Sequence, residues 1–173
     1  MDGPGHDAAC LQSRDSWWRL SGSAVFLHES GPAALAYSVE TDGRFVAKRG
    51  TIRGFVGDRA VDHDMRREAG HWTLDGAAID GLSHLLDLDF GFTPSTNTLA
   101  LKRAPPPVRQ KTSLPAAWFD LDGATLTELS QTYERLSETS FHYRAPSVGY
   151  EGVLEFHGDG FISVYPGLWI RVD

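Results

Sequence analysis

Residues 82–103 read LSHLLDLDFGFTPSTNTLALKR, and this stretch decides how the rest of the chain is interpreted. In its first part, apolar residues at every second position alternate with polar or small ones that include Asp87 and Asp89. A period of two is typical of a β-strand that buries one face. The alternation resumes at Leu99, after the polar segment 93–98. The stretch therefore predicts two strands joined by a rigid polar corner.

The polar corner, TPSTNT at residues 93–98, has both a structural and a functional interpretation. Pro94 favours an extended conformation at Thr93, and serine, threonine and asparagine side chains commonly bond to nearby backbone groups. Such a corner would satisfy its own polar groups and hold the two strands. Alternatively, Thr93, Asn97 and Thr98 would bind the hydroxyl groups of a sugar or a lipid head group. The sequence leaves both interpretations open.

Three motifs resemble those of a bacterial family of uncharacterised proteins that is named for glycolipid binding. The first is DLDFGFTPSTNTL followed by the basic pair 102–103, the second is GHWTLDG at 70–76, and the third is YPGLWIR at 165–171. The resemblance covers nearly the whole chain, and Ala100 departs from it because we expect proline there. It implies a large curved sheet around a cavity, as in lipid-carrier folds, and a lipid or glycolipid-like ligand.

The composition is that of a β-rich globular protein. A chain of 173 residues suits one domain, and 41% hydrophobic residues are enough for a core. The 18 glycines and the 11% of aromatic residues favour many turns and large inward side chains. We therefore predict a disordered N-terminal tail at residues 1–15 and a single β-barrel domain at residues 16–173.

Turn signals at near-regular spacing divide the chain into short strands. Asp-Gly at 42–43 and 122–123 and Gly-Asp-Gly at 158–160 are typical of hairpins. Residues 126–136 fit both the spacing of a helix and the alternation of a strand, and their threonine and serine content favours a long hairpin. The predicted fold is mainly β, an antiparallel closed or half-open β-barrel of many short strands with few helices.

The net charge of −7 disfavours nucleic acids and anionic membrane surfaces as partners. The first residues lack the basic and apolar regions of a signal peptide, and no apolar run reaches the roughly 18 residues needed to span a bilayer. Cys10 is the single cysteine, so no disulfide can form within the chain. These features predict a cytoplasmic protein without a membrane span.

No familiar catalytic or cofactor motif occurs in the sequence. The nucleophile elbow, the glycine fingerprints of nucleotide sites and the histidine spacings of metal sites are all missing, so we expect no cofactor and no metal. The candidate ligand-binding groups are carboxylates, hydroxyls, guanidinium groups that match anions, and amphipathic rings suited to a pocket mouth. They are Asp87, Asp89, Thr93, Asn97, Thr98, Arg103, Tyr133, Tyr165, Trp169 and Arg171.

Three functions are compatible with these observations. The favoured one is a non-enzymatic protein that holds a lipid or glycolipid-like molecule in a barrel cavity. The second is an enzyme that acts on a small amphiphile with Asp87 or Asp89 as acid or base, which requires a carboxylate of raised pKa inside the cavity. The third is a filled barrel that acts through protein contacts, with a possible homodimer through a sheet edge. Cavity volume and carboxylate burial distinguish the three.

Overall fold

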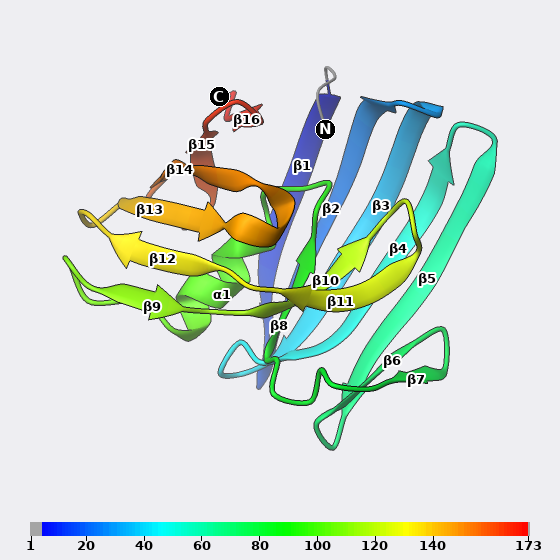
Figure 1. Cartoon of the computed structure of the whole chain (residues 1–173), viewed down its shortest axis with the longest axis horizontal. Coiled ribbons are helices and arrows are strands. Elements are labelled where there is room, and N and C mark those ends of the chain that lie inside the picture. The colour runs from blue at the N-terminus through cyan, green and yellow to red at the C-terminus, as the bar shows by residue number, and fades with distance from the viewer. Residues whose placement is uncertain (1–4, 173) are drawn as a thin grey trace.

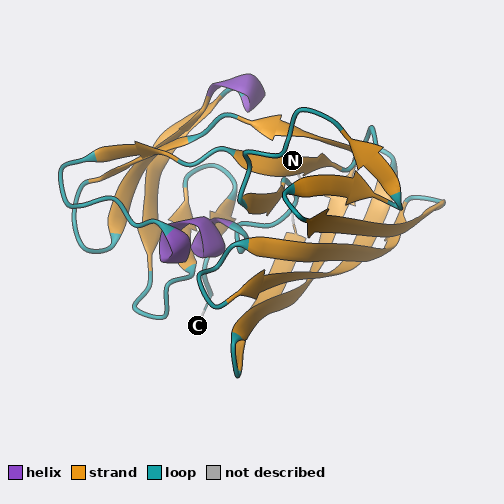
Figure 2. Ribbon diagram, turned by 90° about the horizontal axis from the view of Figure 1, so that it is seen from below, coloured by secondary structure: helices purple, strands orange, loops and turns teal. Residues whose placement is uncertain are grey.

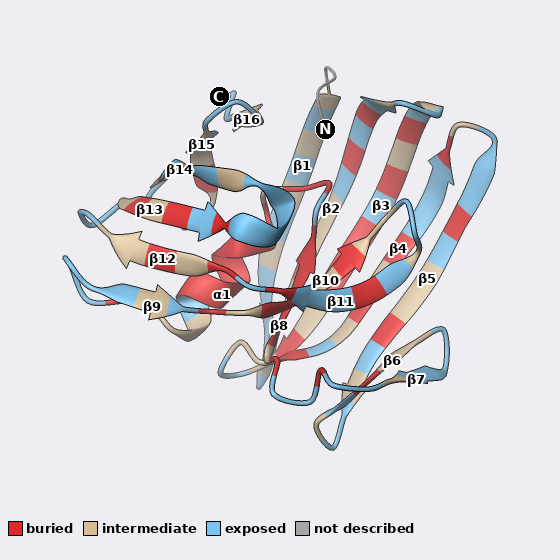
Figure 3. Ribbon diagram, viewed as in Figure 1, coloured by how far each residue is buried: buried red, intermediate tan, exposed pale blue. Residues whose placement is uncertain are grey.

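The computed structural model describes residues 5–172, which form three β-sheets, one α-helix and one 3-10 turn (Figure 1). The largest sheet contains seven antiparallel strands in the order of the sequence. They are β1 (Gly5–Arg14), β2 (Trp17–His28), β3 (Gly31–Asp42), β4 (Ala47–Val56), β5 (Arg59–Glu68), β6 (His71–Leu74) and β7 (Ala77–Ile79). Buried and exposed residues alternate along β2 to β5 (Figure 3), because one face of the sheet packs on the core and the other faces solvent.

Two smaller sheets and the helix complete the fold. The strands of the three-stranded sheet, in the order β11-β10-β8, are β8 (Asp87–Phe90), β10 (Ala116–Asp120) and β11 (Thr125–Leu129). The six-stranded sheet has the order β16-β15-β14-β13-β12-β9, with bounds β9 (Lys111–Ser113), β12 (Thr132–Arg135), β13 (Ser140–Ala145), β14 (Tyr150–Phe156), β15 (Ile162–Tyr165) and β16 (Trp169–Ile170). The helix α1 (Asn97–Arg103) lies between this sheet and the other strands (Figure 2), and the 3-10 turn is Pro146–Val148.

The sheet order confirms the prediction of a mainly β fold, whereas the predicted barrel is not confirmed. Across residues 5–172, none of the three sheets is closed, and the largest sheet ends at β1 and β7. The pair of β8 with β10 is parallel. A parallel pair requires a long crossover connection in place of a hairpin, and the segment that contains α1 provides it.

Two apolar clusters fill the spaces around β8. Leu88 and Phe90 belong to the cluster against the largest sheet, and the second cluster lies between α1 and the six-stranded sheet. Asp87 and Asp89 alternate with them and are only 3% and 8% exposed. The alternation of β8 therefore does not separate a dry face from a wet one. Its carboxylates need partners inside the protein, because a buried unpaired charge is costly.

The close contact of β4 with β8 gives a first testable prediction. A Cβ added at Gly50 would overlap Leu88 Cδ2 and would lie 3.1 Å from Phe90 Cζ. We expect Gly50→Ala to lower the free energy of unfolding by about 1–3 kcal/mol, as overpacking of a core does. Urea denaturation measures the loss, and Gly158→Ala is the control because a Cβ there has no neighbour within 4 Å. Equal stability of the two variants would contradict the described packing.

The predicted disordered tail at residues 1–15 is wrong for the part that the structure describes. Gly5–Arg14 form β1 and pair with β2 along their whole length, and residues 1–4 lie outside the described residues. The segment has weak strand propensity, with alanines, glutamine and aspartate in place of β-branched residues. Pairing with the long β2 compensates for this low propensity.

The second predicted strand of the central stretch is also wrong, because Asn97–Arg103 form the helix α1. Leucine, alanine, lysine and arginine are good helix formers, and Ala100, where we expect proline, is buried inside the helix. Residues 126–136 contain strands, as predicted, and no helix. However, β11 and β12 belong to different sheets, and the hairpin is formed by β12 and β13.

Candidate functional site: a pocket beside a buried polar joint

A hydrogen-bonded cluster around the Asp7 carboxylate helps to join the central segment, residues 87–103, to the largest sheet, and Tyr37 Oη also lies 2.9 Å from Thr93 Oγ1. Asp7 on β1 accepts hydrogen bonds from Thr93 Oγ1 at 2.9 Å and Ser95 Oγ at 2.8 Å. It also accepts one from Tyr37 Oη, on β3, at 2.9 Å. Burial raises the pKa of Asp7, and the three hydroxyl donors offset part of that change. Asp7 therefore fixes the polar corner to two strands of the largest sheet.

The two carboxylates of β8 are paired with the helix and the polar corner. Arg103 donates Nε and Nη2 to the two oxygens of Asp87 at 2.8 and 2.6 Å, the bidentate geometry that guanidinium groups favour. Thr96 Oγ1 donates to Asp89 Oδ2 at 3.0 Å. Burial raises the pKa of Asp87, although Arg103 opposes this change. Burial also raises the pKa of Asp89 to about 6; the bond from Thr96 lowers it, and the charge of Asp87 adds to the rise.

The start of α1 is bound to the six-stranded sheet by amide and phenol groups. Asn97 Nδ2 donates to Tyr133 Oη at 2.7 Å. Gln131 Oε1 accepts hydrogen bonds from Tyr143 Oη at 2.8 Å and from Tyr133 Oη at 3.3 Å. The ring of Tyr165 packs edge-on against Tyr143, with 6.0 Å between the ring centres. This cluster links the helix to β12, β13 and β15.

The other sequence-predicted ligand residues lie apart from one another. Arg171 donates Nη1 to Asp159 Oδ2 at 2.7 Å, and Trp169 is half-buried on β16. Thr98 is buried, and its Oγ1 has no hydrogen-bond partner within residues 5–172. The ten predicted residues are thus not gathered around one opening. Their contacts favour the structural interpretation of the polar corner.

We call the hydrogen bonds that connect residues 87–103 to the largest sheet and to the six-stranded sheet the joint. A pocket of about 600 Å³ lies beside the joint, where the turn between β2 and β3 approaches the turn between β10 and β11. Small-molecule sites commonly have volumes of about 300–1,000 Å³. Its lining residues are Phe26, Leu27, His28, Glu29, Gly91, Phe92, Trp118, Phe119, Asp120, Leu121 and Asp122. Phenylalanine and leucine side chains give it apolar walls, and carboxylates and a histidine supply polar groups. It is the candidate functional site of this chain.

A glycine in the turn just after β8 leaves room for Trp118 in this pocket. A Cβ at Gly91 would lie 2.8 Å from Trp118 Nε1, so the missing side chain leaves room for the indole. Trp118 is partly buried, and no hydrogen bond within residues 5–172 involves its indole N–H. A partly exposed ring with a free donor can cover a ligand ring and bind one of its oxygens.

Two polar contacts connect the walls of the pocket. His28 Nε2 lies 2.9 Å from Asp122 Oδ1, between the two turns. Arg59 Nη2 donates to the backbone oxygen of Leu121 at 3.0 Å. Asp120 accepts bonds from the backbone N–H groups of residues 122 and 123, which fixes the β10–β11 turn. These hydrogen bonds and the ion pair therefore hold the two turns beside the pocket in place.

Comparison with known proteins places the chain in a family. The family model described as "Putative glycolipid-binding" matches residues 1–171. The chain belongs to this family. The crystal structure of a DUF1089 family protein from Pseudomonas aeruginosa is similar, with a TM-score of 0.83, 22% sequence identity, and coverage of 98% of this chain and 94% of that chain. At this identity the likeness shows the fold alone. No curated protein matches the chain.

The central motif predicts the glycolipid-binding family, but it does not predict where the pocket lies. Gly91 and Phe92 are the parts of that motif that line the pocket, and the rest of its lining comes from residues 26–29 and 118–122. The Asp122-Gly123 turn and the tryptophan shortly before it were visible in the sequence. Their approach to β2 depends on the parallel pairing of β10 with β8, which no local pattern indicates.

Thr98 is the predicted residue that lines a second pocket. That pocket has a volume of about 360 Å³ and lies between α1 and turns of the six-stranded sheet. In the described part of the chain, no group of three or more histidine, cysteine or acidic residues is arranged to hold a metal. Within residues 5–172, no helix has the length and apolar character needed to cross a membrane.

Proposed function

We propose that the protein binds a sugar-bearing amphiphile in the 600 Å³ pocket. The observation that carries this proposal is the division of the pocket into apolar walls and polar groups. Leu27 and Leu121 line the pocket and are exposed or partly exposed, so they offer apolar surface to an alkyl chain. Removal of alkyl surface from water would supply most of the affinity. The family name is consistent with this ligand class.

The polar groups of the pocket suit a neutral sugar. Glu29, Asp120 and Asp122 present carboxylate oxygens, which accept hydrogen bonds from hydroxyl groups. Asp120 and Asp122 already have partners, but each carboxylate has about four lone-pair positions and can accept more. The Trp118 ring would donate its N–H, which lies in the ring plane, to a sugar oxygen at the edge of the ring. A phosphate head group fits less well, because three carboxylates would repel it.

A binding function is favoured over catalysis by the position of the carboxylates on β8. The enzyme hypothesis requires Asp87 or Asp89 to face the substrate. Both are bonded to groups of the central segment, and neither lines the two pockets described above. The ligand would occupy an open pocket between sheets in place of the interior of a barrel.

Calorimetric titration with octyl glucoside below its micellar concentration tests this proposal. We expect saturable binding, and we expect Trp118→Phe to weaken it about 3- to 10-fold, since one net hydrogen bond contributes roughly 1 kcal/mol. Trp169→Phe is the matched control, because Trp169 lies on β16 and does not line the pocket. Near-ultraviolet circular dichroism checks the fold of both variants. No saturable binding, or equal affinities of the two variants, would overturn the proposal.

A further inference from the structure

The solvent-facing side of the largest sheet changes from apolar to polar side chains along its strands. One cross-strand row near the β2–β3 turn pairs Val25 with Ala34, Ala34 with Phe55, and Phe55 with Ala60. Val25 and Phe55 are 55% and 46% exposed, and Leu27, two residues further along β2, is 53% exposed. All four strands thus present apolar side chains to solvent at the same end of the sheet. We call Val25, Leu27, Ala34, Phe55 and Ala60 the apolar end.

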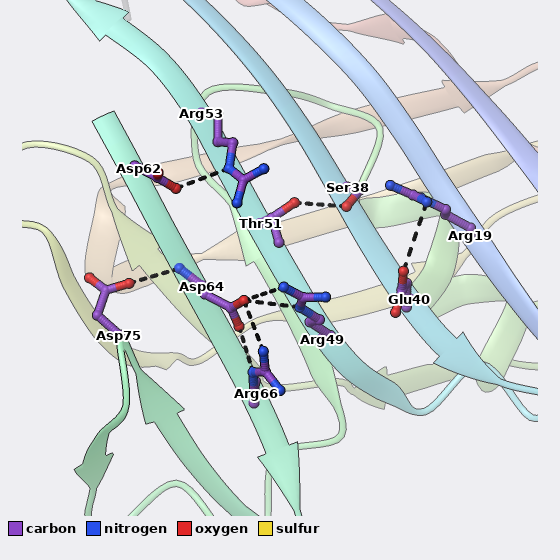
Figure 4. A network of polar contacts seen from close by, with 10 residues as sticks. All are labelled: Arg19, Ser38, Glu40, Arg49, Thr51, Arg53, Asp62, Asp64, Arg66 and Asp75. Atoms are coloured by element: carbon purple, nitrogen blue, oxygen red, sulfur yellow. Dashed lines mark hydrogen bonds and ion pairs between the residues drawn. The ribbon is translucent and has the colours of Figure 1, made fainter. Parts of the chain in front are cut away.

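The same four strands become polar at the next rows, away from that turn. Arg53 pairs with Asp62, and Ser38 bonds to Thr51. Beyond them, Arg49 and Arg66 both bond to Asp64, and Arg19 lies near Glu40 (Figure 4). The change occurs on every strand from β2 to β5, so it belongs to the whole face. Scattered exposed apolar residues are ordinary, but an ordered apolar row at one end of a charged face is typical of a surface that contacts a partner or a membrane.

The apolar end is continuous with the proposed binding pocket. Leu27 belongs to the apolar end and also lines the pocket. The next two residues, His28 and Glu29, line the pocket as well. An amphiphile that leaves the pocket past Leu27 would therefore keep its alkyl chain on apolar surface. A lipid layer can both supply such an amphiphile and receive it.

We propose that the apolar end docks the protein on a lipid surface of low negative charge while the amphiphile enters or leaves the pocket, an inference that rests on the proposed function. The acidic groups around the pocket, Glu29, Asp120 and Asp122, would repel anionic lipids, as would the net charge of −7. Contact is driven by burial of Val25, Leu27 and Phe55 among the acyl chains. The polar rows of the sheet remain in water.

Flotation with phosphatidylcholine vesicles tests this docking surface. We expect the protein to float with the vesicles, and we expect the double variant Val25→Ser/Phe55→Ser to reduce the partition coefficient about tenfold or more. The matched control is Val153→Ser/Val164→Ser, which changes two valines that are 38% and 37% exposed on the six-stranded sheet. This control should float like the unchanged protein. Addition of phosphatidylglycerol to the vesicles should weaken flotation.

Octyl glucoside titration of the same variants separates this inference from the proposed function. Val25 and Phe55 do not line the pocket, so the double variant should keep its affinity for the glycoside. Failure to float with intact glycoside binding would overturn the docking surface alone. Flotation that survives Val25→Ser/Phe55→Ser would also overturn it. So would a concentration-dependent dimer that this variant abolishes in the absence of vesicles, because the face would then bind a second copy.

Discussion

Arg103→Met is expected to lower the free energy of unfolding by about 3–5 kcal/mol, as the loss of one partner of a buried ion pair does. Arg103 forms the bidentate contact with Asp87, and their side chains are only 16% and 3% exposed. Methionine fills much of the same volume but leaves the Asp87 carboxylate without its cation. The lost stability is the cost of burying an ionised carboxylate that has no cationic partner.

The control for this prediction is Arg53→Met, which breaks an ion pair on the outer face of the sheet. Arg53 and Asp62 are 69% and 73% exposed, and exposed pairs contribute about 0–1 kcal/mol. Urea denaturation at neutral pH compares the two variants. The loss in Arg103→Met should shrink at acidic pH, because burial already raises the pKa of Asp87 and the protonated carboxyl is neutral. Equal, small losses in both variants would show that the joint is not held by this pair.

Asp89→Asn is expected to stabilise the protein at pH 7.5 by up to about 3 kcal/mol. The pKa of Asp89 is about 6 in the folded protein, above its ordinary value of 3.8. The folded state therefore binds this proton more tightly than the unfolded state. The stability that protonation contributes is fully present below about pH 4 and is lost as the pH rises through 6. Asparagine is neutral throughout and can still accept the hydrogen bond from Thr96.

Denaturation at pH 4.5 and pH 7.5 measures this effect. The unchanged protein should lose more stability between the two pH values than Asp89→Asn does. Asp62→Asn is the control, because Asp62 is exposed and its substitution should leave the pH dependence as it was. A parallel pH dependence in the unchanged protein and Asp89→Asn, or a clear loss of stability at pH 7.5, would contradict the burial of an ionised carboxylate there.

Most strands could be predicted from local signals, because alternation and Asp-Gly turns act over a few residues. The Asp159 turn and the pairing of β14 with β15 follow directly from such a pattern. The helix α1 could not, since seven residues are too few for a helix to be stable alone. It forms because Asn97 and Arg103, near its two ends, are held by Tyr133 and Asp87. Those partners come from distant parts of the chain.

The candidate site was less accessible to sequence analysis than the fold. Asp87 and Asp89 have the spacing of an outward-facing pair, but both are buried because apolar clusters cover both faces of β8. The family motif therefore contributes to a joint between the sheets, and several residues that the sequence predicts as ligand-binding form hydrogen bonds within the protein. The pocket gathers Leu27, Gly91 and Trp118, which are far apart in the chain. Only the assembled sheets bring them together.

We propose that ligand binds beside the joint, at Trp118, and not at the polar corner. Nuclear magnetic resonance tests it most directly, through the indole N–H signals of the five tryptophans during titration with octyl glucoside. The spectrum of Trp118→Phe assigns the Trp118 signal. We expect a saturable shift of that signal, with the side-chain amide signal of Asn97 unchanged. A shift at the Asn97 amide with a static Trp118 signal would contradict it and return the site to the polar corner.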